Sequence, residues 1–237
     1  MEETNVFYRH PALYDAVQSD TGSAETCRSL IERYCPDAST LVDFGCGTGR
    51  DVEVLTKYYE CVGVDLQPGL VEYARRVRPR LDFRVGDMRT SRLGARMDIV
   101  TCLGNSLAYV HDNHDIERVF ATFAAHARAG GVLVLCSPVW PLMPAEPTRS
   151  TVDTPQGPAT VIIRHEWDLR TQINTMRREW VLASGERARD EILRRVLFPR
   201  ELEHYATAAG FDVLNIMNEP GAGLTGPTAY TVARYAP

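Results

Sequence analysis

Residues 41–50 read Leu-Val-Asp-Phe-Gly-Cys-Gly-Thr-Gly-Arg, and this stretch decides the fold. The run Leu41 to Phe44 is typical of a buried strand, and the glycines after it form a turn that opens a helix. Gly45 allows a tight turn, and Gly47 lets a ligand approach the backbone closely. Backbone amides at a helix start can bind an electronegative group. The stretch therefore predicts a ligand-binding turn between a strand and a helix.

Two acids further along the chain indicate an adenosine-type ligand. Asp65 lies 20 residues after Gly45, at the end of the expected second strand, where a carboxylate can accept hydrogen bonds from both ribose hydroxyls. Asp87 ends the expected third strand, and this second acid disfavours a turn with a purely structural role. The glycine spacing is G-x-G-x-G, with Arg50 where a dinucleotide-binding loop has its last glycine. A nicotinamide cofactor is therefore disfavoured.

The first 137 residues alternate between helical and strand-like periodicity. Strands separated by helices at this spacing imply right-handed crossovers and a parallel sheet covered on both faces. Gly130 and Gly131 are expected to end the last of these helices. The expected strands are residues 41–44, 61–65, 81–85, 99–103 and 132–136, and the expected helices are residues 24–34, 52–59, 70–77 and 116–127.

From about Trp140 the pattern changes to strand-like runs at 160–167, 172–182 and 189–198, separated by turns such as Ser184-Gly185. These runs predict a small antiparallel sheet. A helix after Pro199 and two strands, 211–217 and 229–235, then follow. We expect a single domain over 1–237, in which 1–137 and 199–237 form a cofactor-binding core and 140–198 an antiparallel cap that contacts the acceptor.

Composition excludes several classes of function. The net charge of -5 argues against nucleic acid as a partner. The apolar stretch 132–145 is too short and too often broken by proline to span a bilayer, and the first residues carry acids where a signal peptide carries bases, so we expect a cytoplasmic protein without a membrane contact. The six cysteines lack zinc-site spacing, which predicts reduced thiols and no metal.

Three stretches, in their order and spacing, resemble successive motifs of class I S-adenosylmethionine-dependent methyltransferases: residues 41–50, Gly63-Val-Asp65-Leu66 and Gly86-Asp87-Met88. The resemblance implies a Rossmann-like α/β fold with a seven-stranded sheet, helices on both faces and the antiparallel cap inserted after strand five. It implies S-adenosylmethionine as cofactor, with Asp65 at the ribose, Asp87 and Met88 at the adenine, and Gly45 and Gly47 at the methionine portion. Further cofactor contacts implied by the resemblance are Tyr14, which would close over the cofactor, Leu66, Leu103 and Asn105.

A finer resemblance comes from Tyr14-Asp15, 86–89, 98–106 and 123–134. These stretches are similar to those of N,N-dimethyltransferases that act on nucleotide-linked aminodeoxysugars, and also occur in other natural-product methyltransferases. The resemblance implies an enzyme of secondary metabolism, such as antibiotic biosynthesis, that methylates an amine of a small acceptor. Methylation of a small hydroxyl or carboxyl acceptor and cofactor binding without catalysis stay open. The loop Leu103-Gly-Asn-Ser-Leu-Ala differs from the Asn-Pro-Pro-Tyr type that holds a flipped base.

Tyr109 and His111 are the candidate catalytic residues. The aminosugar enzymes have a histidine where this chain has Tyr109, and a phenol is a weaker base at neutral pH. His111 could substitute if its loop folds inward, and a structural role is equally open for both. Cap residues Trp167, Trp180, Arg177 and Arg194 could bind a sugar nucleotide's base and phosphates. They could instead form the contact of a homodimer.

Overall fold

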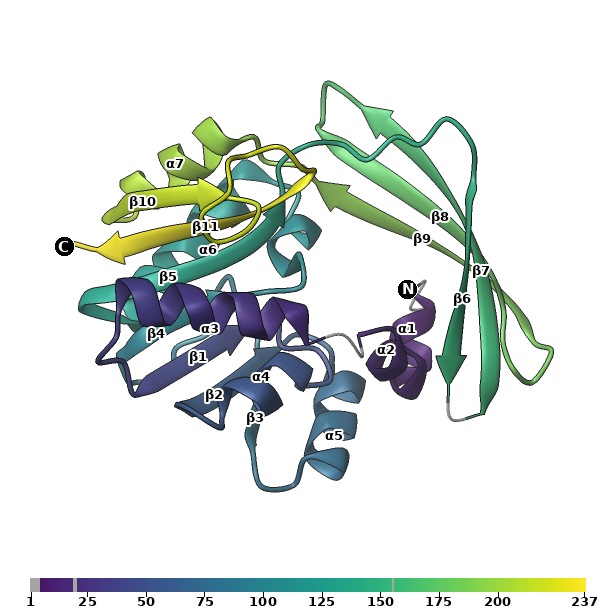
Figure 1. Ribbon diagram of the computed structural model, residues 1–237, viewed down its shortest axis with the longest axis horizontal. Helices are drawn as coiled ribbons and strands as arrows, with labels where there is room; N and C mark the ends of the chain where they lie inside the picture. The colour runs from purple at the N-terminus through teal and green to yellow at the C-terminus, as the bar shows by residue number, and fades with distance from the viewer. Residues whose placement is uncertain (1–4, 19–20, 155) are drawn as a thin grey trace.

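Two sheets organise the chain (Figure 1). The computed structural model describes residues 5–18, 21–154 and 156–237, with a seven-stranded sheet as the core and a four-stranded sheet beside it. The core order is β10-β11-β5-β4-β1-β2-β3, which confirms the seven-stranded prediction. The core strands are β1 (Thr40–Phe44), β2 (Glu60–Asp65), β3 (Asp82–Val85), β4 (Met97–Cys102), β5 (Ala127–Pro138), β10 (Phe211–Met217) and β11 (Thr228–Tyr235).

The direction of these strands fixes where a ligand can bind. β1 to β5 pair in parallel, while β11 runs antiparallel to both of its neighbours. The chain moves outward from β1 through β2 to β3, and then returns to β4 on the other side of β1. In an open α/β sheet, ligands bind beyond the carboxyl ends of the strands at such a reversal of order.

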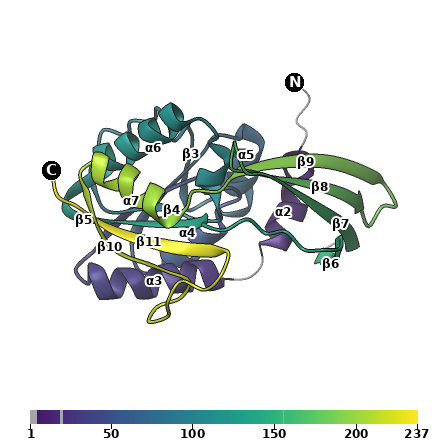
Figure 2. The ribbon, with the colours of Figure 1, turned by 90° about the horizontal axis from the view of Figure 1, so that it is seen from above.

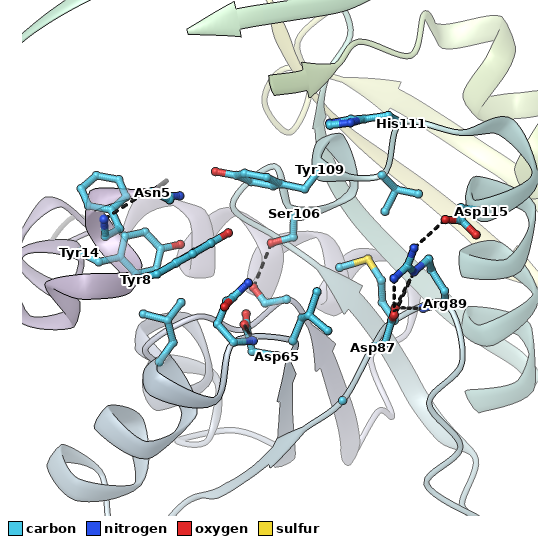
Figure 3. Close-up of a pocket in the computed structure, with 18 of the residues that line it drawn as sticks. Asn5, Tyr8, Tyr14, Asp65, Asp87, Arg89, Ser106, Tyr109, His111 and Asp115 are labelled. Atoms are coloured by element: carbon cyan, nitrogen blue, oxygen red, sulfur yellow. Dashed lines mark hydrogen bonds and ion pairs between the residues drawn. The ribbon is translucent and has the colours of Figure 1, made fainter. Parts of the chain in front are cut away.

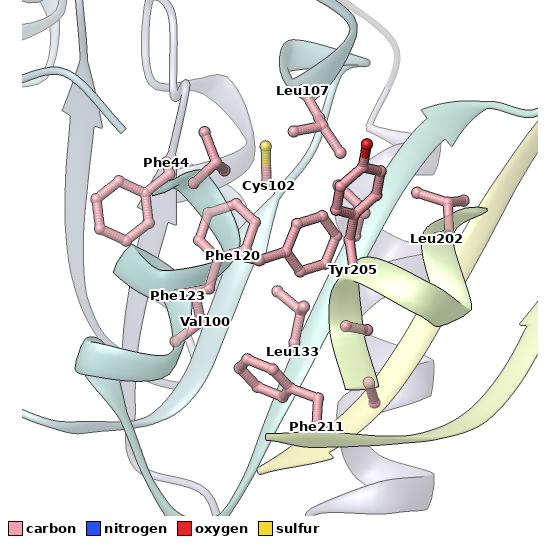
Figure 4. Packing of buried hydrophobic residues seen from close by; sticks show 14 of the residues in the cluster. Phe44, Val100, Cys102, Leu107, Phe120, Phe123, Leu133, Leu202, Tyr205 and Phe211 are labelled. Carbon is pink, nitrogen blue, oxygen red and sulfur yellow. The ribbon is translucent and has the colours of Figure 1, made fainter. Parts of the chain in front are cut away.

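Helices cover both faces of the core sheet, as the sequence predicts. The helices are α1 (Val6–Arg9), α2 (Pro11–Val17), α3 (Gly22–Tyr34), α4 (Arg50–Leu55), α5 (Pro68–Val77), the short 3-10 helix η1 (Ser106–Tyr109), α6 (Asn113–His126) and α7 (Pro199–Ala208). On one face α6 and α7 pack Phe120, Phe123 and Leu202 against β1, β4 and β5 (Figure 4). Full burial of each such side chain contributes roughly 1.5–3 kcal/mol. α3 covers the opposite face.

The glycine pair after α6 does not end that helix, so this prediction is wrong. α6 ends at His126, and β5 begins at the next residue and contains both glycines. Gly130 has a φ of 77°, and the pairing of β4 with β5 shifts register at this point. A Cβ on Gly131 would lie 2.9 Å from the carbonyl oxygens of Arg128 and Asp98. The pair therefore forms an irregularity in the strand, where Gly130 supplies a positive φ and Gly131 a position without room for a side chain.

The smaller antiparallel sheet, here called the cap, comprises β6 (Thr148–Thr154), β7 (Gly157–Asp168), β8 (Ile173–Val181) and β9 (Arg187–Arg195). It follows β5 in the chain, as predicted, but it has four strands where the sequence pattern gave three. β6 was missed because it is an edge strand with mostly exposed polar residues and no apolar alternation. Among the described residues, no helix has the length and apolar character needed to cross a membrane.

The short helices α1 and α2 connect the cap to the core (Figures 1 and 2). α2 contacts β6 of the cap and α5 of the core, and α1 contacts β9 and α5. Asp15 of α2 forms ion pairs with Arg50 at 3.0 Å and with Arg78 at 3.2 Å. Arg50, which replaces a dinucleotide-type glycine, therefore joins the glycine turn to the helix that carries Tyr14.

Candidate active site

A cavity of about 350 Å³ opens where the carboxyl ends of β1, β2 and β3 face α1 and α2 (Figure 3). This is the edge at which the strand order reverses, and its volume falls in the range of roughly 300–1,000 Å³ typical of small-molecule sites. The cavity brings together eight predicted site residues: Tyr14, Gly45, Asp65, Leu66, Asp87, Met88, Tyr109 and His111.

Asp65 lies at the base of this cavity as the last residue of β2, and it is 9% exposed. One carboxylate oxygen accepts a hydrogen bond from the amide of Gly47 and the other from the amide of Gln67, both at 2.8 Å. Burial raises the pKa of Asp65, and these two hydrogen bonds oppose the rise. A carboxylate has about four acceptor sites, so Asp65 holds the glycine turn in place and keeps capacity for two donors from a ligand.

The glycine turn leaves no room for side chains. Gly45 has a φ of +81° and Gly47 a φ of +55°. A Cβ on Gly47 would lie 2.7 Å from the ring of Tyr14. That ring stacks on Phe7 of α1 with 5.0 Å between centroids, and burial raises the pKa of Tyr14 so that its phenol stays neutral. Glycine is therefore needed here because an aromatic ring from α2 covers the turn.

Asp87 is held by an arginine next to it. The guanidinium of Arg89 donates to both carboxylate oxygens of Asp87, at 2.6 Å at its nearest, and to Asp115 of α6 at 2.7 Å. The hydrogen bonds from Arg89 lower the pKa of Asp87. Leu66, which is 52% exposed, and Met88 add apolar surface to the same cavity. This side of the cavity combines a fixed carboxylate with a surface suited to a flat apolar ring.

Tyr109 and His111 lie on the opposite side of the cavity, at and after η1. The Tyr109 hydroxyl accepts a long hydrogen bond of 3.5 Å from Arg194 of β9. His111 donates from Nε2 to the carbonyl oxygen of Leu193 at 3.0 Å, since a carbonyl only accepts. The neutral imidazole can then accept a proton only at Nδ1. His111 therefore joins the loop to the cap, and Tyr109 is the freer of the two candidates.

Three predicted residues lie outside the lining of this cavity. Leu103 lines a separate hollow of about 30 Å³ together with Tyr14 and Gly45. The amide of Gly47 donates a hydrogen bond to Asp65, and the Tyr14 ring lies against Gly47. Asn105 has a left-handed φ of 63°, and its side-chain oxygen is buried without a partner among the described residues. Its cofactor role stays a prediction.

Other lining residues were not predicted as site residues, although Gly86, Arg89 and Ser106 belong to stretches that carry the family resemblance. Asp112 is the N-cap of α6, so only the pattern of a helix start marks it. Ser106 donates to the carbonyl of Gly45 at 3.0 Å and so joins the two loops. The lining residues absent from the prediction are Asn5, Phe7, Tyr8, Gln67, Leu70, Gly86, Arg89, Ser106, Val110, Asp112 and Asp115.

The structure also describes the state of the cysteines and the groups that could hold a metal ion. All six cysteines are free, and burial raises the pKa of the Cys46 thiol well above its ordinary range, which disfavours a thiolate in the glycine turn. The described part of the chain contains no group of three or more His, Cys, Asp or Glu placed to hold a metal ion.

The cavity suits an adenosine-containing sulfonium ligand. Asp65 offers acceptors for hydroxyls, the apolar surface of Leu66 and Met88 suits a planar base, and Gly45 brings backbone without a side chain of its own to the cavity wall. Its carboxylates, Asp65, Asp87, Asp112 and Asp115, outnumber Arg89 among these lining residues and favour a cation.

Comparison with known proteins agrees with this chemistry. Residues 41–131 match a methyltransferase domain family. The chain is 30% identical over 224 residues to a dTDP-3-amino-3,6-dideoxy-alpha-D-glucopyranose N,N-dimethyltransferase of Streptomyces fradiae, covering 90% of this chain and 88% of that protein. It is 34% identical over 146 residues to a dTDP-4-amino-2,3,4,6-tetradeoxy-D-glucose N,N-dimethyltransferase of Saccharopolyspora spinosa, covering 58% of each. A solved SAM-bound amino pentose methyltransferase from Micromonospora echinaspora superposes with a TM-score of 0.81 at 25% identity, covering 99% of this chain and 100% of that one.

The fold and cavity define an S-adenosylmethionine-dependent methyltransferase. The chain belongs to the methyltransferase family that includes the dTDP-aminodeoxysugar N,N-dimethyltransferases. Its cofactor is S-adenosylmethionine, as the resemblance implied.

Proposed function

We propose that this enzyme methylates the amine of a nucleotide-linked aminodeoxysugar. The observation that carries the proposal is the similarity to the Streptomyces fradiae enzyme, which extends over 90% of the chain. A match of that length includes most of the cap as well as the cofactor-binding core. Because Tyr109 of the cavity contacts Arg194 of the cap, a match that includes the cap supports a similar acceptor.

The cavity residues divide into groups that would hold different parts of the cofactor. Asp65 would accept the ribose hydroxyls, while Leu66, Asp87 and Met88 would contact the adenine. The methionine portion would lie against the backbone of the Gly45 to Gly47 turn, beside the small hollow that Gly45 and Leu103 line. Tyr14 would cover that portion, because its ring already lies over Gly47. These assignments rest on position relative to the cavity.

The chemistry asks mainly for positioning by this chain. When bound, S-adenosylmethionine supplies a methyl group made electrophilic by its sulfonium. The protein must hold a neutral amine in line with that methyl group, and positioning alone supplies much of the rate of such a transfer. Tyr109 lies at the cavity with its hydroxyl only weakly engaged, so we assign it to orient the acceptor amine.

Mass spectrometry of reaction products tests the proposal. The purified protein is incubated with S-adenosylmethionine and a panel comprising a dTDP-linked amino-deoxysugar, phenols and carboxylic acids. We expect one or two added methyl groups on the aminosugar and none on the other compounds. Methylation of hydroxyl or carboxyl compounds alone would contradict the proposal and favour an O-methyltransferase. Cofactor binding without any product would indicate a non-catalytic protein.

Replacing Tyr109 by phenylalanine should lower kcat/KM for the acceptor by roughly 2- to 10-fold, the effect of losing one neutral hydrogen bond. The KM for S-adenosylmethionine should not change, because the ring remains in place. Steady-state kinetics at saturating cofactor measures this effect. A general base contributes typically ~10²–10⁴-fold, so a loss in that range would mean that Tyr109 removes a proton. Tyr58, an exposed tyrosine that does not line the cavity, provides the matched Tyr→Phe control.

A further inference from the structure

The inner face of the cap carries a row of polar side chains across three neighbouring strands. In the strand register, Asn174 of β8 pairs with Arg194 of β9, and His165 of β7 hydrogen-bonds the side chain of Asn174 at 2.9 Å. Asn174 also donates to the carbonyl oxygen of Leu142 at 3.1 Å. The imidazole and the amide therefore have partners within the protein. Arg194, at the end of the row, is next to Tyr109 of the cavity.

Arg194 is half-buried, unlike the exposed cap arginines Arg149, Arg170 and Arg187, and within the described ranges it lacks the carboxylate partner that five other cap arginines have. Arg164, Arg177, Arg178, Arg189 and Arg195 each lie within 4.0 Å of a carboxylate. Within the described ranges, no carboxylate forms an ion pair with Arg194, and its Nε is buried without a hydrogen-bond partner. Its guanidinium donates the long hydrogen bond to the Tyr109 hydroxyl. The central carbon of the guanidinium lies 5.6 Å from the centre of the Tyr109 ring. A partly buried guanidinium with unused donors is suited to bind an anion.

The charges around the cavity have opposite signs on its two sides. The core contributes Asp65, Asp87, Asp112 and Asp115, partly compensated by Arg89. Arg194 adds positive charge from the cap side, and its field lowers the pKa of Tyr14 against the larger effect of burial. A cationic cofactor on the acidic side and an acceptor with an anionic part near Arg194 would satisfy both sides.

We propose that Arg194 binds the diphosphate of the nucleotide-linked acceptor, with Tyr109 supporting the guanidinium from one face. The proposal rests on the proposed function, because the diphosphate belongs to that acceptor class. The guanidinium fork matches two phosphate oxygens at once, which lysine cannot do. Arg194 would thereby hold the nucleotide outside the cavity while the sugar amine enters past Tyr109.

The test compares Arg194→Gln with Arg189→Gln, a control on the same strand whose side chain is 82% exposed. Kinetics with a dTDP-linked aminosugar should show KM for the acceptor raised roughly 10- to 100-fold by Arg194→Gln, from the loss of charged hydrogen bonds. KM for S-adenosylmethionine should be unchanged. Arg194→Lys should restore part of the loss, and Arg189→Gln should have no effect.

Calorimetric titration with dTDP separates this proposal from the proposed function, since it needs no methyl transfer. We expect the parent protein to bind dTDP, and Arg194→Gln to weaken that binding by a similar factor. Equal dTDP affinity in parent and Arg194→Gln would overturn the role of Arg194, whether or not the aminosugar is methylated. Arg194-dependent binding of a tricarboxylate probe in place of dTDP would likewise overturn the diphosphate assignment.

Discussion

Replacing Asp65 by alanine should weaken the binding of S-adenosylmethionine at least ~100-fold. Two hydrogen bonds from ribose hydroxyls to a carboxylate contribute roughly 1.5–3 kcal/mol each, and every 1.4 kcal/mol is a factor of ten. The same substitution removes the acceptors of the Gly47 and Gln67 amides. The glycine turn would then lose its anchor, which adds to the loss of affinity.

Calorimetric titration with S-adenosylhomocysteine measures this loss without catalysis. Asp82→Ala is the matched control, because Asp82 lies on the neighbouring strand β3 and forms an exposed pair with Arg84. Asp65→Asn keeps one side-chain oxygen as an acceptor, so its affinity should fall between those of the parent and Asp65→Ala. If Asp65→Ala binds S-adenosylhomocysteine as tightly as the parent, the ribose assignment is wrong.

The core of the fold was predictable because its signals are local. The glycine turn, the strand before it and the acid at the end of β2 stand close together in sequence, and short-range periodicity identifies each element. Gly130 and Gly131 show the limit of such reasoning. A glycine pair after a helix has the same local pattern whether it ends the helix or accommodates the close approach of a neighbouring strand. Only the position of the Asp98 carbonyl decides between these cases.

The cap side of the site could not be predicted in the same way. Arg194 and Tyr109 are 85 residues apart, and the packing of β9 against η1 brings them together. His111 donates from Nε2 to the carbonyl oxygen of Leu193, which lies 82 residues further along the chain, and its catalytic role stays a prediction. The contributions of Phe7 and Tyr8, and of the N-cap Asn5, come from a helix of four residues and its first cap, too short for a periodic pattern. Long-range pairing, which sequence spacing does not encode directly, determines these positions.

A buried ion pair on the cap determines where that short helix lies. Arg178 of β8 donates to both carboxylate oxygens of Asp190 of β9, at 2.8 and 2.6 Å, and the two side chains are 4% and 0% exposed. Asp190 also accepts from the amide of Val6 at 2.7 Å, and Arg178 donates to the side chain of Asn5 at 2.9 Å. Asn5 caps α1 through the amide of Phe7. The pair thus fixes the start of α1, and with it the aromatic side of the cavity.

Replacing Asp190 by alanine should therefore lower the free energy of unfolding by about 3–5 kcal/mol, the cost of leaving a buried guanidinium without its counter-ion. Urea denaturation measures the change. Glu191→Ala, at the next position of β9, is the control: Glu191 pairs with Arg177 at the surface, where ion pairs contribute roughly 0–1 kcal/mol. Unchanged stability of Asp190→Ala would mean that the pair does not hold α1.

The double variant Arg178→Met with Asp190→Leu separates the stability of the protein from the positioning of α1. Apolar replacement of a buried ion pair is often neutral or stabilising, so this variant should regain much of the stability lost by Asp190→Ala. It still leaves the amide of Val6 and the side chain of Asn5 without their partners on the cap. We therefore expect its affinity for S-adenosylhomocysteine to stay below that of the parent, because Phe7 and the Tyr14 ring that stacks on it would lose their fixed position over the glycine turn. Parent-like affinity in the stable double variant would show that apolar packing of α1 is enough to position Tyr14.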